Sequence, residues 1–244
     1  MSNAFFNIHP RRRASRPVLS GRLQMVAELL PPGQRIVDIG TDHAYLPIST
    51  ILNGRYGEAV ATDVRSGPLH KAALNIKRFG LSDKISLKQT NGLAGIEQKP
   101  EDVVVIAGLG GLEMIDIIKN ATATWPLLVL QPQKSAPQLR RFLLENSYQI
   151  TAEKLCLDKG RLYLALLVQY NTSEIEREHT GYEAADYYLG PVLRRDRPPL
   201  FAEYLLKQRK QAAFDSKREP KLTNLVDEMN ELIDKLKVAD LSKA

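Results

Sequence analysis

The chain has 244 residues, enough for one α/β domain of ordinary size and a smaller appendage. Its 43% hydrophobic and 25% charged residues, with a net charge of +6, are typical of a globular protein, and no apolar run reaches the ~18 residues of a membrane-spanning helix. The single cysteine, Cys156, excludes an internal disulfide and a cysteine-rich metal site, and without a secretory signal we expect a cytoplasmic protein.

Strands and helices alternate from about residue 35, which predicts a mostly parallel sheet. Strands are expected at residues 35–39, 58–64, 85–89, 103–106 and 127–130. Helices are expected at residues 19–31, 44–52, between an N-cap at Ser66 and Gly80, at 112–119 and at 135–144. The strand at 103–106 is apolar throughout and is therefore expected near the centre of the sheet.

Two further strands, 148–157 and 162–170, are separated by a short linker that contains glycine, which predicts a β-hairpin. With the five preceding strands they give a seven-stranded, mostly parallel, Rossmann-like sheet with an antiparallel edge strand. This is the architecture of class I methyltransferases that use S-adenosyl-L-methionine (SAM). Ordinary nicotinamide-binding domains usually lack the terminal hairpin.

Beyond residue 171 the strand signals stop, and leucines with Met229 repeat after Pro220 at alternating spacings of three and four residues. This seam extends over little more than two heptads, so two helices packed as an antiparallel hairpin are a better interpretation than a free-standing coiled coil. We therefore expect a catalytic domain at residues 1–170 and a small helical, coiled-coil-like domain at residues 171–244.

The first strand leads into the sequence DIGTDHAYLP, residues 38–47. Gly40 would let the backbone approach a ligand, but Asp42 stands where the second glycine of a dinucleotide-binding turn would be. A carboxylate there repels a pyrophosphate and is compatible with the cationic methionyl part of SAM. We therefore expect Asp38, Gly40, Thr41, Asp42 and His43 to bind SAM.

The next strand ends are also candidates for the cofactor site. Asp63 closes the second strand, where an acid can accept hydrogen bonds from ribose hydroxyls. Asn91 and Gly92 follow the third strand, and the amide could recognise the adenine amino group, although Asn-Gly is also ordinary turn chemistry.

Three glycines follow the fourth strand in Gly108-Leu109-Gly110-Gly111, and such a loop lets the backbone run close to a ligand or substrate. Gly108 is therefore a further cofactor candidate, and all four residues are candidates for the pocket of the target base. Gln131 and Gln133, after the fifth strand, are expected to project into the same crevice. The sequence contains no Cys/His cluster that could bind zinc, so no metal site is expected. Cys156 lies in the predicted hairpin, away from the strand ends that form the expected site.

Together, the DIGTDHAYLP string, the Gly108–Gly111 loop, Gln131-Pro132-Gln133 and the helical tail resemble the bacterial TrmK family. The resemblance covers essentially the whole chain, and Leu109 departs from it because methionine is usual there. It implies a class I SAM-dependent enzyme that methylates N1 of the adenine at position 22 of tRNA. Tyr45 could stack on a base, or could simply pack in the protein.

A tRNA partner fits the charge distribution, since residues 1–35 and 194–221 each carry a net charge of +5 and residues 36–170 carry +2. The expected tRNA contacts are Arg11, Arg12, Arg13, Arg16, Arg194, Arg195, Arg197, Lys207, Arg209 and Lys210. Solvated charged faces remain the alternative for these segments. Two other functions stay open: a small-molecule methyltransferase and a catalytically weak SAM- or RNA-binding module. The sequence does not fix the oligomeric state, and it is compatible with a monomer.

Overall fold

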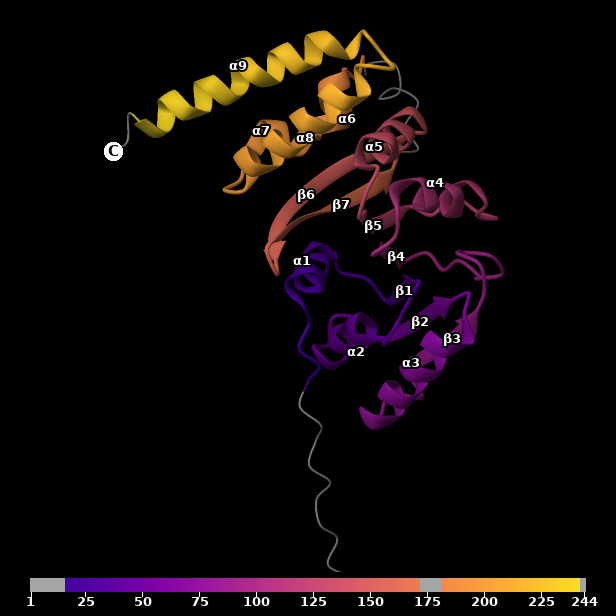
Figure 1. The fold of residues 1–244 in the computed structure, drawn as a ribbon. Coiled ribbons are helices and arrows are strands. Elements are labelled where there is room, and N and C mark those ends of the chain that lie inside the picture. The colour runs from indigo at the N-terminus through magenta and orange to yellow at the C-terminus, as the bar shows by residue number, and fades with distance from the viewer. Residues whose placement is uncertain (1–15, 172–180, 242–244) are drawn as a thin grey trace, which may run out of the picture.

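The computed structural model describes residues 16–171 and 181–241. Seven strands of this part of the chain form one sheet in the order β3-β2-β1-β4-β5-β7-β6 (Figure 1). The strands are β1 (Arg35–Ile39), β2 (Glu58–Asp63), β3 (Ile85–Gln89), β4 (Asp102–Ala107), β5 (Leu127–Gln131), β6 (Tyr148–Asp158) and β7 (Arg161–Tyr170). Each predicted strand is confirmed, and β1 to β5 are parallel.

The sheet places its most apolar strands at the centre, as the sequence predicts. All five residues of β1 and the first five of β4 are buried, whereas three of the five residues of the edge strand β3 are exposed. Parallel strands that are covered on both faces need such continuous apolar runs. Because parallel strands end on the same side, the turns after β1, β2, β3 and β4 meet at one edge of the sheet.

The hairpin corrects one detail of the prediction. β7 pairs antiparallel with both β5 and β6, so the antiparallel strand lies inside the sheet and β6 forms the edge. The two strands are joined by Lys159 and Gly160, which both have positive φ, at 51° and 74°. Two successive positive φ values define a type I′ turn, whose twist matches that of the flanking strands.

Helices cover both faces of the sheet. They are α1 (Gly21–Leu29), α2 (Tyr45–Leu52), α3 (Ser66–Arg78), α4 (Gly111–Lys119) and α5 (Ala136–Glu145). Side chains of α1, α2 and α3 form one hydrophobic cluster with Ile36 and Val105, and those of α4 and α5 form the other with Val37 and Ile106. Adjacent residues of one strand thus serve opposite faces, as strand geometry requires.

One predicted cap is wrong, because Ser66 is the first residue of α3 and Arg65 occupies the N-cap position, without a side-chain cap. The expected glycine after this helix is confirmed at Gly80, which has a φ of 69°. In that conformation its N–H donates to the carbonyl of Lys77 and ends the helix.

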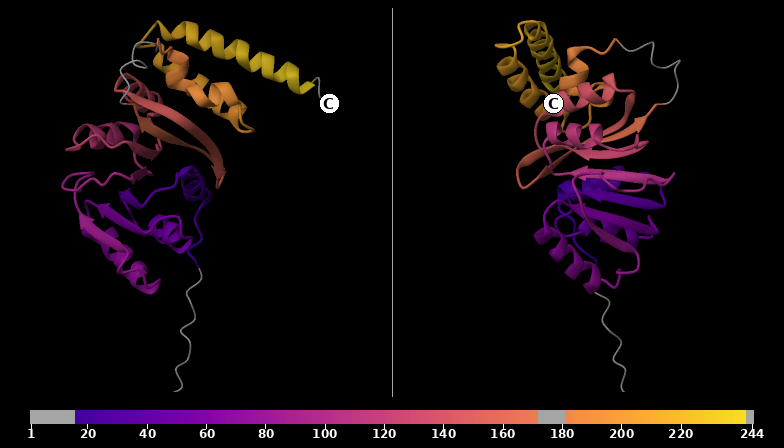
Figure 2. Two further views of the ribbon diagram at one scale, coloured as in Figure 1. Left: turned by 180° about the vertical axis from the view of Figure 1, so that it is seen from behind. Right: turned by 90° about the vertical axis from the view of Figure 1, so that its right-hand side faces the viewer.

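Four helices follow the hairpin in the described part of the chain: α6 (Ala184–Leu189), α7 (Pro191–Asp196), α8 (Phe201–Asp215) and α9 (Leu222–Leu241). The sequence predicts α8 and α9, which pack as an antiparallel pair (Figures 1 and 2). It does not predict the short helices α6 and α7. Leu222, Leu225 and Met229 of the predicted seam are buried.

The helical region shares its hydrophobic core with the sheet. Leu143 of α5, Tyr188 of α6, Leu205 of α8 and Met229 of α9 belong to a single buried cluster that also contains the α4–α5 face of the sheet. Figure 2 shows these helices stacked on that end of the sheet, next to β6 and β7. None of the described helices is both long enough and apolar enough to cross a membrane.

A buried ion pair lies where the two regions meet. The side chains of Arg140 on α5 and Glu153 on β6 are both 0% exposed, and Arg140 Nε donates to Glu153 Oε1 at 2.8 Å. Arg140 Nη1 donates to the carbonyl oxygens of Tyr187 and Tyr188 and to the hydroxyl of Tyr204. One arginine therefore joins α5, β6, α6 and α8.

The carboxylate of the same pair holds the start of α7. Glu153 Oε2 accepts hydrogen bonds from the backbone N–H groups of Val192 and Leu193, at 3.0 and 3.1 Å. Gly190, just before α7, has a φ of 85° and approaches the carboxylate so closely that a Cβ atom would collide with it. A side chain at this position would break the contact, which explains the glycine.

Candidate active site

A cavity of about 160 Å³ opens at the edge of the sheet where the turns after β1 to β4 meet. It is lined by Ile39, Gly40, Thr62, Asp63, Val64, Arg65, Thr90, Asn91, Gly92, Leu109, Glu113 and Ile117. The structure thus brings together the predicted candidates Gly40, Asp63, Asn91, Gly92 and Leu109, which come from four different turns. Ligands of open α/β sheets bind in this kind of crevice.

The turn after β1 is held by backbone and hydroxyl contacts. Gly40 has a φ of 75°, and the N–H of Thr41 donates to the carbonyl of Thr62 on the neighbouring strand. Thr41 Oγ1 accepts a hydrogen bond from the N–H of Ala44 at 3.2 Å. Burial raises the pKa of Asp38 to about 6, and a hydrogen bond with Thr41 opposes the rise.

The next side chains of this turn lie on the surface rather than in the cavity. Asp42 is exposed; its Oδ2 lies 3.0 Å from His43 Nε2, and its Oδ1 forms an ion pair with Lys71 Nζ at 3.6 Å. The ring of His43 stacks on that of Tyr45 with 5.1 Å between centroids and 11° between planes. Tyr45 is 36% exposed, so this stacked pair presents an aromatic surface to solvent.

Asp63 is the carboxylate that faces the cavity from β2, and its side chain is only 7% exposed. Its Oδ1 accepts hydrogen bonds from the backbone N–H of Arg65 at 2.8 Å and from Arg65 Nε at 3.4 Å. Its Oδ2 accepts none from the described residues. One carboxylate oxygen therefore fixes the turn, and the other remains available to a ligand.

The Asn91-Gly92 turn closes the same cavity from β3. Gly92 has a φ of 58°, and a Cβ atom there would lie 3.0 Å from Ile117 of α4. Both the backbone conformation and the close packing thus favour glycine. Asn91 is exposed and lines the cavity.

The Gly108–Gly111 loop is tied to the loop after β5. Gln133 Nε2 donates to the carbonyl of Gly108 at 2.7 Å, and the N–H of Gly111 donates to the carbonyl of Lys134 at 2.9 Å. A Cβ atom on Gly111 would collide with the carbonyl of Ser135. Gly111 is therefore needed for contact between the two loops, whereas Leu109 is the residue of this loop that lines the cavity.

Arg22 of α1 reaches this edge of the sheet and is not predicted by the sequence. Its Nη1 donates to Gln131 Oε1 at 2.6 Å, and its guanidinium lies 5.9 Å from the ring centroid of Tyr163. A Cβ atom on Gly108 would lie 2.8 Å from the same Nη1. A lone arginine in a short helix has no spacing pattern that could identify it, because its position depends on how α1 packs against β6 and β7.

Contrary to the sequence prediction, Gln131, the last residue of β5, and Gln133 do not both project into the crevice. Gln131 is 0% exposed and is hydrogen-bonded to Arg22 and to the carbonyl of Pro132, so it is part of the wall of the crevice. Gln133 is exposed and lines a second cavity, on the side of α8.

The predicted tRNA-binding residues are dispersed. Arg11, Arg12 and Arg13 lie outside the described residues. Arg16 donates to the carbonyl of Leu52, Arg209 donates to Asn230, and Arg197 and Lys210 are exposed. Arg194 and Arg195 form ion pairs with Asp186 and Asp196, while the exposed Lys207 lines the second cavity.

The residues present fit SAM. Asp63 supplies a carboxylate oxygen that accepts no hydrogen bond from the described residues, as ribose hydroxyls require. Gly40 and Gly92 leave the backbone open to an approaching ligand, and Leu109 and Ile117 add apolar surface for an adenine ring. The buried Asp38 and the exposed Asp42 place negative charge at the turn after β1, where it would face the cationic methionyl group of SAM.

Comparison with known proteins shows the family to which the chain is similar. The family model TrmK, described as tRNA (adenine(22)-N(1))-methyltransferase, matches residues 36–240. A tRNA (adenine(22)-N(1))-methyltransferase of Bacillus subtilis (strain 168) is 31% identical over 224 residues, which cover 86% of this chain and 94% of the relative.

Solved structures extend the similarity to the fold and the cofactor. A Streptococcus pneumoniae protein in complex with S-adenosyl-L-methionine superposes with a TM-score of 0.76 and 30% identity, covering 88% of this chain and 100% of that one. TrmK of M. capricolum in complex with S-adenosyl-homocysteine has a TM-score of 0.69 and 26% identity, with coverage of 88% and 98%. Since the family model spans the sheet, the crevice and most of the helical tail, this chain belongs to the TrmK family, tRNA (adenine(22)-N(1))-methyltransferase.

Proposed function

We propose that this protein transfers the methyl group of SAM to N1 of the adenine at position 22 of tRNA, in the cytoplasm. The observation that carries the proposal is the family match over residues 36–240, which includes the crevice and the helices α6 to α8. A small-molecule methyltransferase would not explain why a relative named as a tRNA methyltransferase matches 86% of this chain, more than the sheet region alone.

The crevice residues are proposed to bind and orient the cofactor, which supplies an electrophilic methyl group on a sulfonium. Asp63 accepts hydrogen bonds from the ribose hydroxyls through its Oδ2. Asn91 and Gly92 lie beside the adenine ring, and Gly40 and Gly108 let the backbone approach the methionyl part. Asp38, Thr41, Asp42 and His43 complete the turn on the cationic side of the ligand.

The target base enters from the side of the Gly108–Gly111 loop in this proposal. N1 of adenine carries an in-plane lone pair and no proton at neutral pH, so the reaction needs alignment rather than a general base. Leu109 and the neighbouring glycines shape the pocket, and Tyr45 is available to stack on a base. The product base is cationic, and carbonyl or carboxylate oxygens near the pocket would stabilise the developing charge.

An adenine in folded tRNA must be exposed before its N1 can be reached, and unstacking or unpairing it costs free energy. The basic residues at 11–16 and 194–210 are proposed to offset this cost by binding phosphates. The ion pairs of Arg194 and Arg195 leave part of each side chain exposed, and surface ion pairs of this kind are weak enough to exchange for phosphate contacts.

The direct test is methyl transfer from tritiated SAM to an unmodified tRNA transcript, followed by nucleoside analysis. We expect N1-methyladenosine at position 22 and no incorporation into a transcript in which guanine replaces that adenine. Methylation of small molecules with no methylation of tRNA would overturn the proposal.

A further inference from the structure

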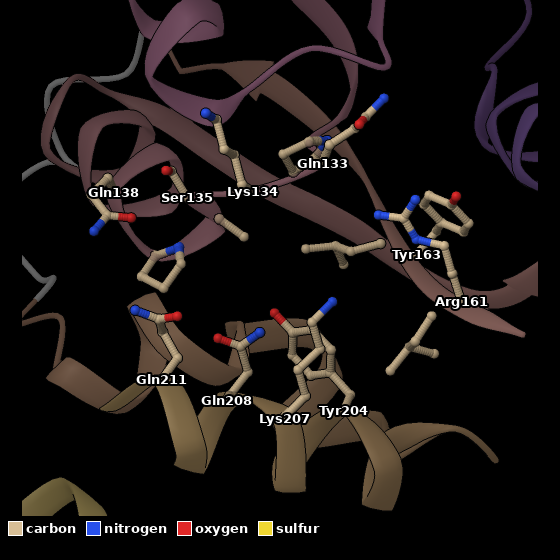
Figure 3. A pocket seen from close by; sticks show the side chains of 15 residues that line it. Gln133, Lys134, Ser135, Gln138, Arg161, Tyr163, Tyr204, Lys207, Gln208 and Gln211 are labelled. Atoms are coloured by element: carbon tan, nitrogen blue, oxygen red, sulfur yellow. The ribbon is translucent and has the colours of Figure 1, made fainter. Parts of the chain in front are cut away.

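A second cavity lies between the sheet and α8, outside the crevice described above (Figure 3). Its volume of about 470 Å³ is within the ~300–1,000 Å³ typical of small-molecule sites. The loop after β5 forms one wall, the start of β7 another, and α8 the third. We call it the inter-region cavity and define it by Lys134, Arg161, Tyr163, Lys207, Gln208 and Gln211.

The inter-region cavity is next to the proposed target-base pocket. Gln133 and Lys134 line it, and the same two residues hold the Gly108–Gly111 loop, through the bonds from Gln133 to Gly108 and from Gly111 to Lys134. A chain that delivers one base to that loop therefore has its neighbouring nucleotides within reach of the cavity.

The lining is basic and rich in amides. Lys134, Arg161 and Lys207 contribute three positive charges, and none of the described residues that line the cavity is acidic. Figure 3 shows Lys207, Gln208 and Gln211 extending from α8 toward the loop after β5. Cations for phosphate, amides for base edges and the half-buried ring of Tyr163 are what recognition of an RNA nucleotide requires.

Gln208 is the residue that points most directly to a ligand. Its side chain lines the cavity, the residue is only 6% exposed, and its Oε1 is buried without a hydrogen-bond partner among the described residues. Gln211, one turn later, differs because its Nε2 donates to Asp215. A buried amide oxygen without a partner is costly, and native proteins keep few such atoms. Rotation of the amide presents either oxygen or nitrogen to the cavity.

We propose that the inter-region cavity binds a nucleotide of the tRNA other than the methylated adenine. In this arrangement the amide of Gln208 reads the base edge, and Lys207 and Arg161 contact its phosphates. The inference rests on the proposed function and adds a specificity site to it. The helical region then acts in substrate selection, because α8 supplies the reading residue.

The first test is steady-state methylation of a tRNA transcript by Gln208→Leu, which keeps the size of the side chain and removes its amide. We expect the KM for tRNA to rise roughly tenfold, the usual effect of losing one hydrogen bond worth about 1.4 kcal/mol. The SAM affinity should stay unchanged, and the melting temperature should stay equal or rise because a buried amide oxygen without a partner is removed. A purely structural role would instead lower the melting temperature and leave KM unchanged.

Two comparisons separate reading of a base from binding of a phosphate. Lys207→Ala should make the log–log salt slope of tRNA affinity shallower by roughly 0.7–0.9, whereas Gln208→Leu should leave the slope as it is. The matched control is Gln149→Leu, an exposed glutamine on β6 that does not line the cavity, and it should leave KM unchanged. Transcripts substituted at each nucleotide flanking adenine 22 should reveal one position where only the wild-type protein discriminates.

The outcomes distinguish this inference from the proposed function. If the wild-type protein does not methylate tRNA, the proposed function fails, and this inference fails with it. If it does, and Gln208→Leu has the wild-type KM and the wild-type nucleotide preferences, the inter-region cavity is not a nucleotide site. Should Gln208→Leu fail to fold, Gln208→Glu retains the shape and brings a negative charge toward phosphate. A wild-type KM for that variant would equally overturn the proposal.

Discussion

Two carboxylates of the active-site edge, Asp38 and Asp63, come from neighbouring strands but have different surroundings. Asp38 is enclosed, and its burial raises its pKa to about 6. Asp63 faces the cavity, and one of its oxygens is held by Arg65. A motif of acids at strand ends identifies both residues, but only the packing around each one separates a buried acid from a ligand-facing one.

We expect Asp38 to make the stability of the protein depend on pH. Its native pKa of about 6 lies above the unfolded value of 3.8, so between these values the native state holds a proton that the unfolded state has lost. The contribution of protonated Asp38 to the free energy of unfolding is therefore present at acid pH and is lost as the pH rises through about 6. Asp38→Asn should not show this loss. Between pH 4 and neutral pH, the free energy of unfolding of the variant should rise relative to that of the wild type by up to roughly 3 kcal/mol. Urea unfolding at several pH values measures it, and parallel curves for the two proteins would refute it.

For Asp63 we expect an effect on cofactor binding, beside the loss of the hydrogen bonds from Arg65 that hold the turn. Asp63→Ala should weaken SAM binding by roughly 1–3 kcal/mol, the cost of losing a hydrogen bond to a charged group. Calorimetric titration gives the affinity, with Asp83→Ala as the control, because Asp83 is an exposed acid outside the cavity. An unchanged affinity in Asp63→Ala would remove Asp63 from the cofactor site.

At the scale of elements, the Arg140–Glu153 pair links the helices of the tail to the sheet. Five elements meet at these two side chains: α5, α6, α7, α8 and β6. The two residues are 13 positions apart, on a segment predicted only as an ordinary helix and on the following one predicted only as an ordinary strand. Neither residue has a local signature, since a charged residue of a helix or strand is usually exposed.

Removing one partner of this pair should be strongly destabilising, because the other charge stays buried and unpaired. We expect Arg140→Met or Glu153→Gln to lower the free energy of unfolding by roughly 3–5 kcal/mol. The double variant Arg140→Met/Glu153→Leu should recover only part of this loss, because the N–H groups of Val192 and Leu193 lose their acceptor.

Urea unfolding provides the measurement, and a neighbouring pair provides the control. Lys154 on β6 contacts Glu28 at 2.9 Å with both side chains about half exposed, so Lys154→Met should cost less than about 1 kcal/mol. Equal losses for Lys154→Met and Arg140→Met would contradict the importance of burial.

At the scale of the whole molecule, the sheet and the helical tail are joined by a continuous hydrophobic cluster. The change of sequence pattern at residue 171 predicts a domain boundary, and the division into 1–170 and 171–244 remains a proposal about folding units. The interface contains Leu143, Tyr188 and Leu205, together with the buried ion pair.

We expect a chain truncated after residue 171 to lose stability, because it exposes the apolar side chains of α5 and leaves Arg140 and Glu153 open to solvent. We expect a loss of several kcal/mol, and each kcal/mol lowers the melting temperature of a domain of this size by about 2–4 °C. The melting temperature should therefore fall by more than about ten degrees. Circular dichroism melting and dye binding to exposed apolar surface test this. A fragment with the wild-type melting temperature would show that the sheet region folds independently.

The basic segments should make tRNA binding steeply dependent on salt. Affinity should fall with a log–log slope of about −0.7 to −0.9 for each phosphate neutralised. Replacing Arg11, Arg12, Arg13 and Arg16 by alanine should make the slope shallower, whereas SAM affinity should be unaffected. Fluorescence anisotropy at several salt concentrations measures the slope, and an identical slope in the variant would exclude these arginines from the interface.

The sequence by itself determined the seven strands, the helices other than α6 and α7, and the likeness to the TrmK family. Apolar runs, glycines at turns and the DIGTDHAYLP string depend on residues close together in the chain, so hydrophobic periodicity and local turn chemistry suffice to read them. The order of strands and helices along the chain predicts the type of fold. Because parallel strands end on the same side of the sheet, it also predicts that Gly40, Asp63 and Asn91 meet at one edge.

Only the tertiary structure decided what depends on contacts between distant segments. The insertion of β7 between β5 and β6, the arrival of Arg22 beside Gln131 and the burial of Gln208 all result from packing. Local sequence preferences alone would allow β7, Arg22 and Gln208 to occupy other places in the fold. The free energy of burying both faces of the sheet selects one arrangement, and no neighbouring residue in the sequence carries that information.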